Sequence, residues 1–275
     1  MTTPKDDATI PWSQAAHAKD SALLAARAAT LRALHYAPEP LVLPNVWDAA
    51  SARIVAEAGF PAIATTSSGV SACLGWADGE QTPPVEMFAA IARIARVVTV
   101  PVTADLEGGY GLGAEEFVAR LLATGAVGCN IEDTDRSGHS LLRDPDAQAE
   151  YLAAVKQAGR AAGVDIVVNA RIDVFVRQFG ELGERVAEAI RRARIYLDAG
   201  ADCIYPIFVR EEAAIAALVV GIAGPVNIFA LPDGPSLTRL GQLGVARISY
   251  AGRLYRAAFA EHERCVQAIR TGADM

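Results

Sequence analysis

The feature that most constrains the fold of this chain is an alternation of short β-branched runs with longer helical stretches, repeated eight times. The expected strands cover residues 41–45, 62–66, 102–106, 127–131, 166–170, 203–207, 226–230 and 246–249. The expected helices cover residues 48–58, 84–97, 114–124, 145–162, 181–199, 210–220, 235–242 and 252–270. Strands and helices that alternate in this way form βαβ units around a parallel sheet. Eight units predict an α/β protein with a (β/α)₈ TIM-type barrel.

The length of the chain suits one barrel. Barrels of this type need about 250 residues, and the chain has 275 with no linker or low-complexity segment to divide it. We therefore expect a single domain over residues 1–275. An Ala-rich stretch over residues 12–36 predicts an additional helix ahead of the first strand, and residues 1–10 are expected to be flexible.

Composition excludes several classes of function. The formal net charge of -7 leaves no basic footprint for nucleic acid or for an anionic membrane surface. The N-terminal sequence lacks a secretory pattern and no apolar run has the length of a membrane span, so a cytoplasmic protein is expected. Motifs for nucleotide cofactors are absent. None of the three lysines (Lys5, Lys19 and Lys156) lies at a predicted strand end, which argues against Schiff-base aldolases and pyridoxal enzymes.

Carboxylates gather where the third and fourth predicted strands end, the edge at which barrel enzymes carry their chemistry. Asp105 and Glu107 lie at the end of one strand and Glu132 lies at the end of the next. Acids on one rim repel each other unless a cation compensates, and oxygen ligands without histidine favour Mg²⁺, with Mn²⁺ as the alternative. A simpler interpretation is that these acids cap helices or pair with arginines, and it applies most readily to Asp133.

Other residues of the same rim suit an anionic substrate. Arg171 ends an otherwise apolar strand, where a guanidinium can hold a carboxylate through two hydrogen bonds. Thr66, Ser67 and Ser68 end the second strand with hydroxyls and free amides, which can hold a carboxylate or an oxyanion. A structural salt bridge and an ordinary loop are the respective alternatives. His139 is the one histidine in a loop on this face of the predicted barrel.

The motifs at these strand ends resemble the isocitrate lyase and phosphoenolpyruvate mutase superfamily. They are LPNVWDAASARIVAEAGF, TTSSGVSACLGWADGE, VTADLEGGYG, NIEDT, NARIDVF, VNIFALPDGPS and LGVARISYAG, in the order expected for the family. The resemblance implies an enzyme that forms or cleaves a C–C or P–C bond beside a 2-oxo acid. It also implies a metal that stabilises the negative charge of the enolate.

The resemblance further implies roles for individual residues. Asp105 is implied as the direct metal ligand, and Asp78, Glu107 and Glu132 as the acids that hold the water shell of the metal. The residues predicted to bind substrate are Thr66, Ser67, Ser68, Trp47, Asp78, Arg171 and Asn227. The residues predicted to take part in catalysis are Arg171, Glu132, Ser137 and His139.

The loop after the fourth strand departs from the family. Isocitrate and methylisocitrate lyases carry Lys/Arg-Cys-Gly-His there, whereas this chain reads TDRSGHSLLRD, with Ser137 in place of the cysteine and His139 retained. A serine at its ordinary pKa exchanges protons poorly compared with a tuned thiol. The Lys-Thr-Asn-Ser loop of the mutases is also absent. Efficient isocitrate cleavage and phosphonopyruvate chemistry are therefore not expected.

The resulting prediction is a Mg²⁺-dependent lyase or hydrolase that cleaves a C–C bond of a small 2-oxo or hydroxy di- or tricarboxylate. One alternative is an isocitrate or methylisocitrate lyase in which His139 or water replaces the thiol. Another is a protein that binds a 2-oxo acid such as 2-oxoglutarate without converting it. A metal-dependent aldolase of a different barrel family would share the acids and the arginine but not the SSGVSACLG or NARIDVF motifs.

The resemblance also implies an assembly. Members of the superfamily are commonly dimers of dimers that exchange their last helix, and the expected helix at residues 252–270 could pack in that way. We therefore expect a homotetramer, although an ordinary closing helix would have the same sequence pattern.

Overall fold

The computed structural model describes residues 14–136, 138 and 141–272, and it confirms the predicted alternation of strands and helices. The strands are β1 (Leu41–Leu43), β2 (Asn45–Val46), β3 (Ile63–Thr65), β4 (Val102–Asp105), β5 (Gly128–Glu132), β6 (Val167–Ile172), β7 (Cys203–Pro206), β8 (Asn227–Phe229) and β9 (Arg247–Ser249). The helices are α1 (Gln14–Leu34), α2 (Ala49–Glu57), α3 (Ser67–Leu74), α4 (Pro84–Ala95), α5 (Ala114–Thr124), α6 (Pro145–Ala161), α7 (Leu182–Asp198), α8 (Glu212–Gly221), α9 (Leu237–Gln242) and α10 (Arg253–Thr271). The expected flexibility of residues 1–10 concerns a segment outside the described residues.

The parallel strands follow one another around a ring. Six of them pair in the order β2-β3-β4-β5-β6-β7, and the other three pair in the order β1-β9-β8. An isolated parallel bridge between Ile204 and Val226 joins β7 to the start of β8, where the N–H of Ile204 donates to the carbonyl of Pro225 at 2.9 Å. The expected first strand, residues 41–45, is divided at Pro44. Because proline has no N–H to donate, β1 pairs with β9 on one side while β2 pairs with β3 on the other.

Helix α3 was not expected from the sequence, which suggested a Ser-rich loop at this point. Thr66 is its N-cap residue, and the helix ends at Gly75, whose φ of 85° is the left-handed conformation that glycine adopts at low cost. Serine and glycine are weak helix formers, so local propensity does not predict this short helix. Its position directly after β3 decides the shape of the site described below.

Helix α1 covers the amino ends of the strands. Its Leu31 is fully buried and lies close to Gly128, the first residue of β5, where an added Cβ would come within 2.8 Å of the leucine side chain. Nε of Arg32 donates to Oδ1 of Asp202 at 2.7 Å, and Nη2 donates to the carbonyl of Asp165 at 2.7 Å. These acceptors precede β7 and β6. The opposite, carboxyl end of the strands remains open for a site.

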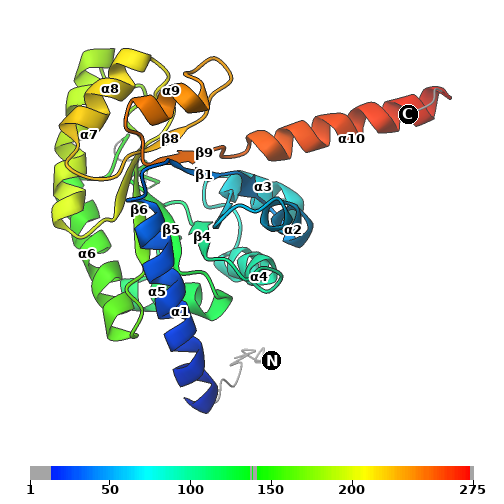
Figure 1. Cartoon of the computed structure of the whole chain (residues 1–275), viewed down its shortest axis with the longest axis horizontal. Coiled ribbons are helices and arrows are strands. Elements are labelled where there is room, and N and C mark those ends of the chain that lie inside the picture. Colours follow the sequence, from blue (N-terminus) through cyan, green and yellow to red (C-terminus); the bar gives the residue numbers. More distant parts are fainter. Residues whose placement is uncertain (1–13, 137, 139–140, 273–275) are drawn as a thin grey trace, which may run out of the picture.

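Helix α10 leaves the barrel and projects away from it (Figure 1). It has no buried residue in the described chain. Its first turns contact the barrel through Tyr255, whose ring packs edge-on against Trp47 with centroids 5.4 Å apart. Within the described ranges, no helix combines the length and apolar character required to cross a membrane.

Leu31→Ala tests the closure of the barrel by α1. Removing this buried side chain leaves a cavity, and we expect the free energy of unfolding to fall by about 2–5 kcal/mol in urea titrations. Leu23→Ala in the same helix is the matched control, because Leu23 is 52% exposed and its loss should cost less than about 0.5 kcal/mol. Equal effects of the two substitutions would contradict the placement of α1.

Candidate active site

Asp105, the last residue of β4, has a carboxylate that is held on one side only. The backbone N–H and the hydroxyl of Ser67 both donate to Oδ2, at 3.2 and 3.1 Å. The N–H of Asp105 donates to the hydroxyl of Thr65 at 2.9 Å, which fixes the strand end. Oδ1 is buried and has no hydrogen-bond partner in the described part of the chain. A cation would satisfy this oxygen, because carboxylate oxygens are preferred ligands of Mg²⁺.

The first turn of α3 forms the corner beside this carboxylate. The N–H groups of a first helical turn lack acceptors within the helix, so those of Ser68 and Gly69 can meet an anion. Gly69 is required by close packing, since an added Cβ would lie 2.8 Å from Cγ2 of Thr66 and 3.0 Å from Cβ of Trp47. The hydroxyls of Thr66 and Ser68 are 3.1 Å apart. The structure thus brings together the residues predicted to cradle the substrate carboxylate.

Glu107 is buried in the loop after β4, in a left-handed backbone conformation with φ of 50°. Its Oε2 accepts the N–H of Glu80 at 2.6 Å, and its Oε1 accepts the hydroxyl of Tyr110 at 2.8 Å. Burial, followed by the negative charge of Asp78, raises the pKa of Glu107 to about 7, although the Tyr110 hydrogen bond acts in the opposite direction. The cost of keeping this carboxylate ionised is therefore high unless a positive charge lies near it.

Arg171, near the end of β6, is held between two carboxylates. Its Nη1 lies 2.8 Å from Oε2 of Glu132, and its Nε donates to Oδ1 of Asp173 at 2.7 Å. Nη2 donates to Oδ2 of Asp173 at 3.2 Å. Burial acts against the charge of Arg171, but the carboxylates of Asp173 and Glu132 raise its pKa well above the ordinary value. Burial raises the pKa of Glu132, and Arg171 opposes that effect.

Asp133 has the structural role that the sequence predicted for it, because it pairs with an arginine and holds the backbone of Asp173. Its Oδ1 accepts the N–H of Asp173 at 2.8 Å. Its Oδ2 accepts the hydroxyl of Tyr196 at 2.8 Å and Nη1 of Arg192 at 3.0 Å, both from α7. Burial and the neighbouring Asp173 raise the pKa of Asp133 to about 6. Asp133 and Asp173 therefore anchor Arg171 to the outer helix layer.

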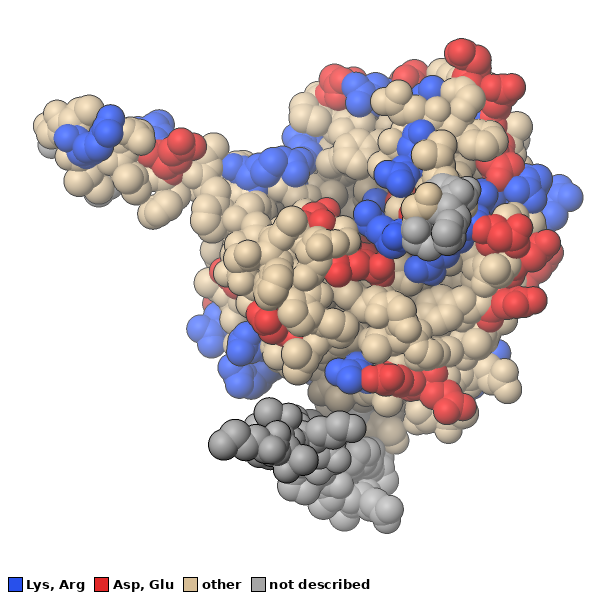
Figure 2. Space-filling view, turned by 180° about the vertical axis from the view of Figure 1, so that it is seen from behind, with Lys and Arg blue, Asp and Glu red and all other residues tan. Residues whose placement is uncertain are grey.

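Sequence reasoning did not assign a role to Arg136 or to Asp173. Nη2 of Arg136 binds Oε1 of Glu132 and lies 3.8 Å from Oε2 of Glu107, so this arginine bridges two of the predicted metal-site acids. The sequence offered one indication for each residue: Arg136 lies four positions after Glu132, and Asp173 lies two positions after Arg171. On the face of the molecule drawn in Figure 2, a group of basic side chains lies beside acidic side chains.

The predicted metal ligands do not form a closed cage. Asp78 is exposed, and partial loss of water together with the charge of Asp105 raises its pKa. Among the residues described, no three acids, histidines or cysteines are placed to ligate one ion. Mg²⁺ commonly binds one or two carboxylates and keeps several waters. Oδ1 of Asp105 fits such a ligand. The oxygens of Glu107 and Glu132 already bind groups of the chain, and the expectation that these two acids and Asp78 hold the water shell of the metal remains a prediction.

Among the described residues, Asn227 is the predicted site residue that is not brought to this cluster. Ser137 and His139 lie outside the described residues. Asn227 is the first residue of β8, at its amino end, and its buried Oδ1 accepts the hydroxyl of Ser249 at 3.1 Å. Its Nδ2 has no partner within the described chain. The predicted contact of Asn227 with substrate remains a prediction.

Comparison with known proteins agrees with this geometry. Residues 31–270 match the profile of the family described as phosphoenolpyruvate phosphomutase. A solved structure from Burkholderia cenocepacia J2315 is 40% identical, with a TM-score of 0.83, over 89% of this chain and 98% of that chain. Oxaloacetate acetylhydrolase in complex with oxalate is 25% identical, with a TM-score of 0.80, over 90% and 87% of the two chains.

A third solved structure is that of 2,3-dimethylmalate lyase, a member of the phosphoenolpyruvate mutase and isocitrate lyase superfamily. It is 28% identical to this chain, with a TM-score of 0.77, over 90% of this chain and 88% of that chain.

Glu107→Gln tests how much free energy of unfolding is lost when the buried carboxyl of Glu107 ionises. A carboxyl whose pKa is raised by folding stabilises the folded state below the unfolded value of 4.5, and that stability is lost as pH rises toward about 7. The free energy of unfolding of metal-stripped protein should therefore fall between pH 5 and pH 8. Glu107→Gln should reduce this fall by up to about 3 kcal/mol in urea titrations. The exposed Glu116→Gln is the control, and a variant that keeps the full wild-type fall would contradict the prediction.

Proposed function

Since this chain belongs to the phosphoenolpyruvate phosphomutase family, within the isocitrate lyase and phosphoenolpyruvate mutase superfamily, we propose that it is a Mg²⁺-dependent carbon–carbon lyase or hydrolase. Its proposed substrate is a small 2-oxo or hydroxy di- or tricarboxylate. The observation that carries the proposal is the buried carboxylate of Asp105, with Oδ2 fixed by Ser67 and Oδ1 left without a partner in the described chain. When bound, Mg²⁺ supplies a Lewis acid that stabilises negative charge on an enolate.

Arg171 binds the substrate carboxylate in this proposal. A guanidinium carries five N–H donors, and three of those of Arg171 are directed at Asp173 and Glu132. Two donors remain, which is the number required for a bidentate bond to a carboxylate. The side chain is 15% exposed, so it can reach a ligand while its orientation stays fixed.

The first turn of α3 is proposed to orient the end of the substrate that does not bind Arg171. The N–H groups of Ser68 and Gly69 suit a carboxylate or the oxygen on which negative charge develops, because fixed amide donors stabilise that charge without reorganising. Trp47 packs beside this turn through contact with Gly69. Its ring packs edge-on against Tyr255 with centroids 5.4 Å apart, and we propose Trp47 as a further substrate contact.

Proton transfer is assigned to the β5–α6 loop, on sequence grounds. Ser137 and His139 are the proposed candidates, and Glu132 lies at the base of the same loop in contact with Arg136. The substrate class is supported by oxaloacetate acetylhydrolase, a protein of similar structure that was solved with its product oxalate. A 2-oxo diacid is accordingly our first choice of substrate.

The proposal predicts ligand binding that depends on both Mg²⁺ and Asp105. Metal-stripped protein would be screened by thermal shift against oxalate, oxaloacetate, 2-oxoglutarate, pyruvate, isocitrate, methylisocitrate and phosphonopyruvate, each with and without Mg²⁺. We expect a di- or tricarboxylate to raise the melting temperature only with Mg²⁺, since a ligand of the native state stabilises it. Asp105→Asn should abolish the shift, whereas Asp146→Asn on the outside of α6 should keep it.

Turnover then separates an enzyme from a binding protein. Product formation from the stabilising acid, followed by NMR, should fall at least a hundredfold in Asp105→Asn. Binding without product in the wild type would favour the alternative of a 2-oxo-acid-binding protein. If neither acid nor metal shifts the transition, the assignment of Asp105 and Arg171 is wrong.

The homotetramer is also part of the proposal. One face of α10 carries Tyr255, Phe259, Val266 and Ile269, at the spacing that places side chains on one side of a helix. Phe259, Val266 and Ile269 are 44%, 46% and 63% exposed. A second copy of the chain, receiving α10 against its own barrel, would cover this face.

Phe259→Glu tests the assembly. A buried charge in an apolar interface is strongly unfavourable, so the variant should sediment as a smaller species than the wild type in analytical ultracentrifugation. Glu263→Gln in the same helix should leave the mass unchanged. A wild-type protein that sediments as a monomer would contradict the proposal directly.

A further inference from the structure

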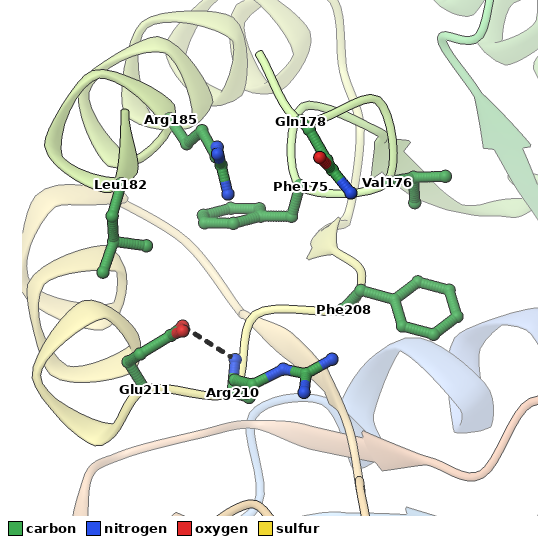
Figure 3. Close-up of a pocket in the computed structure, with 8 residues that line it drawn as sticks. All are labelled: Phe175, Val176, Gln178, Leu182, Arg185, Phe208, Arg210 and Glu211. Atoms are coloured by element: carbon green, nitrogen blue, oxygen red, sulfur yellow. Dashed lines mark hydrogen bonds between the residues drawn. The ribbon is translucent and has the colours of Figure 1, made fainter. Parts of the chain in front are cut away.

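A cavity lies between the loops that follow β6 and β7, at the carboxyl ends of these strands. Its volume is about 480 Å³, within the range of sites that hold small molecules. The loop after β6 and the first turn of α7 form one wall, and the loop after β7 forms the other (Figure 3). No residue assigned above to the metal, the substrate carboxylate or proton transfer lines it.

The walls of this cavity combine apolar surface with positive charge. Phe175, Leu182 and Arg185 line one side, with the guanidinium group of Arg185 beside the Phe175 ring, and Phe208 and Arg210 line the other (Figure 3). An apolar body with an anionic end suits such a lining, because the rings contact the body while arginine donates to the anion.

The two arginines are available to a ligand to different degrees. Arg185 donates to backbone carbonyls, among them that of Gly180 at 2.8 Å, and pairs with no carboxylate among the described residues. Arg210 lies 3.0 Å from Asp233, but both side chains are at least half exposed, so solvent weakens that pair. The acid in the lining, Glu211, accepts the backbone N–H of Arg210 at 3.3 Å. Arg185 is therefore the principal anion-binding group.

The backbone on both walls is held in an unfavourable conformation. Gln178 and Phe208 have φ values of 51° and 68°, in the left-handed region that non-glycine residues rarely adopt. The Phe208 ring is fixed by edge-on packing against Phe229, with centroids 5.2 Å apart. Strained residues that the surroundings hold in place concentrate at ligand-binding positions. Both strained residues of this region line the cavity.

One short segment of the chain runs from the candidate active site to a wall of the cavity. Arg171 donates from Nε to the side chain of Asp173. The backbone N–H of Arg177 donates to the carbonyl of Asp173 at 2.9 Å and closes a turn over residues 173–177. Phe175 lies within that turn. Phe175 is four positions after Arg171 in the chain, so their Cα atoms are at most about 14 Å apart. A ligand held by Arg171 could extend into the cavity.

We propose that this cavity is a subsite for the distal arm of the substrate, and that the arm is an apolar chain or ring ending in a carboxylate. The inference rests on the proposed function and narrows it, because oxalate, pyruvate and oxaloacetate are too short to use the cavity. The substrate class becomes an elongated 2-oxo or hydroxy diacid. Phe175 and Phe208 contact its apolar part, and Arg185 binds its terminal carboxylate.

Isothermal titration with oxalate and a series of 2-oxo acids in the presence of Mg²⁺ tests the subsite. The probes are oxalate, 2-oxoglutarate, 2-oxoadipate and 2-oxosuberate, with 2-oxooctanoate as the long acid that lacks the second carboxylate. We expect 2-oxosuberate to bind about tenfold more tightly than 2-oxoglutarate and than 2-oxooctanoate, since a charge-assisted hydrogen bond is worth roughly one tenfold step in Kd.

Arg185→Gln should raise the ratio of the Kd of 2-oxosuberate to the Kd of oxalate about tenfold. Arg191→Gln, on the outer surface of the same helix, should leave that ratio unchanged. Equal affinity along the wild-type series, or an unchanged ratio in Arg185→Gln, would overturn the subsite while oxalate binding upholds the proposed function. Failure of every acid, oxalate included, would overturn the proposed function and the subsite with it.

Discussion

The carboxyl end of this barrel holds several carboxylates in a small volume that excludes most water, and the rest of the site is arranged around their negative charge. Asp105, Glu107 and Glu132 are all buried there, and like charges in such surroundings cannot remain ionised without compensation. The chain provides part of it through the amide of Ser67 and the guanidinium of Arg171. Oδ1 of Asp105 receives no such partner within the described chain, and for this reason the rim suits a cation.

The residues that compensate the acids are themselves held from behind. Asp173 orients Arg171 through two hydrogen bonds, and Asp133 fixes the backbone of Asp173 while binding Arg192 on α7. This sequence of contacts runs from the rim to the outer helices. In the proposed function, a substrate carboxylate would therefore bind Arg171 without displacing the bonds that orient it, which would keep the site rigid where charge develops.

Much of this arrangement was accessible from the sequence, because it depends on local order along the chain. Parallel strands end at one edge, so residues at the ends of predicted strands, such as Asp105 and Arg171, meet there whatever the side-chain details. Helix α3 and the break at Pro44 were missed because neither depends on local propensity. The bridging role of Arg136 was missed for a similar reason, since a long flexible side chain can take many directions from one backbone position.

By itself, the sequence determined the order of strands and helices, the rim on which the acids and Arg171 lie, and membership of the superfamily, since periodicity and motif spacing are properties of the chain. Only the tertiary structure decided which oxygens are satisfied. It placed Ser67 on one oxygen of Asp105 and left the other without a described partner, and it opened the cavity between Phe175, Arg185 and Phe208. These outcomes depend on side-chain directions and on contacts between segments far apart in the chain, which the residue pattern does not specify.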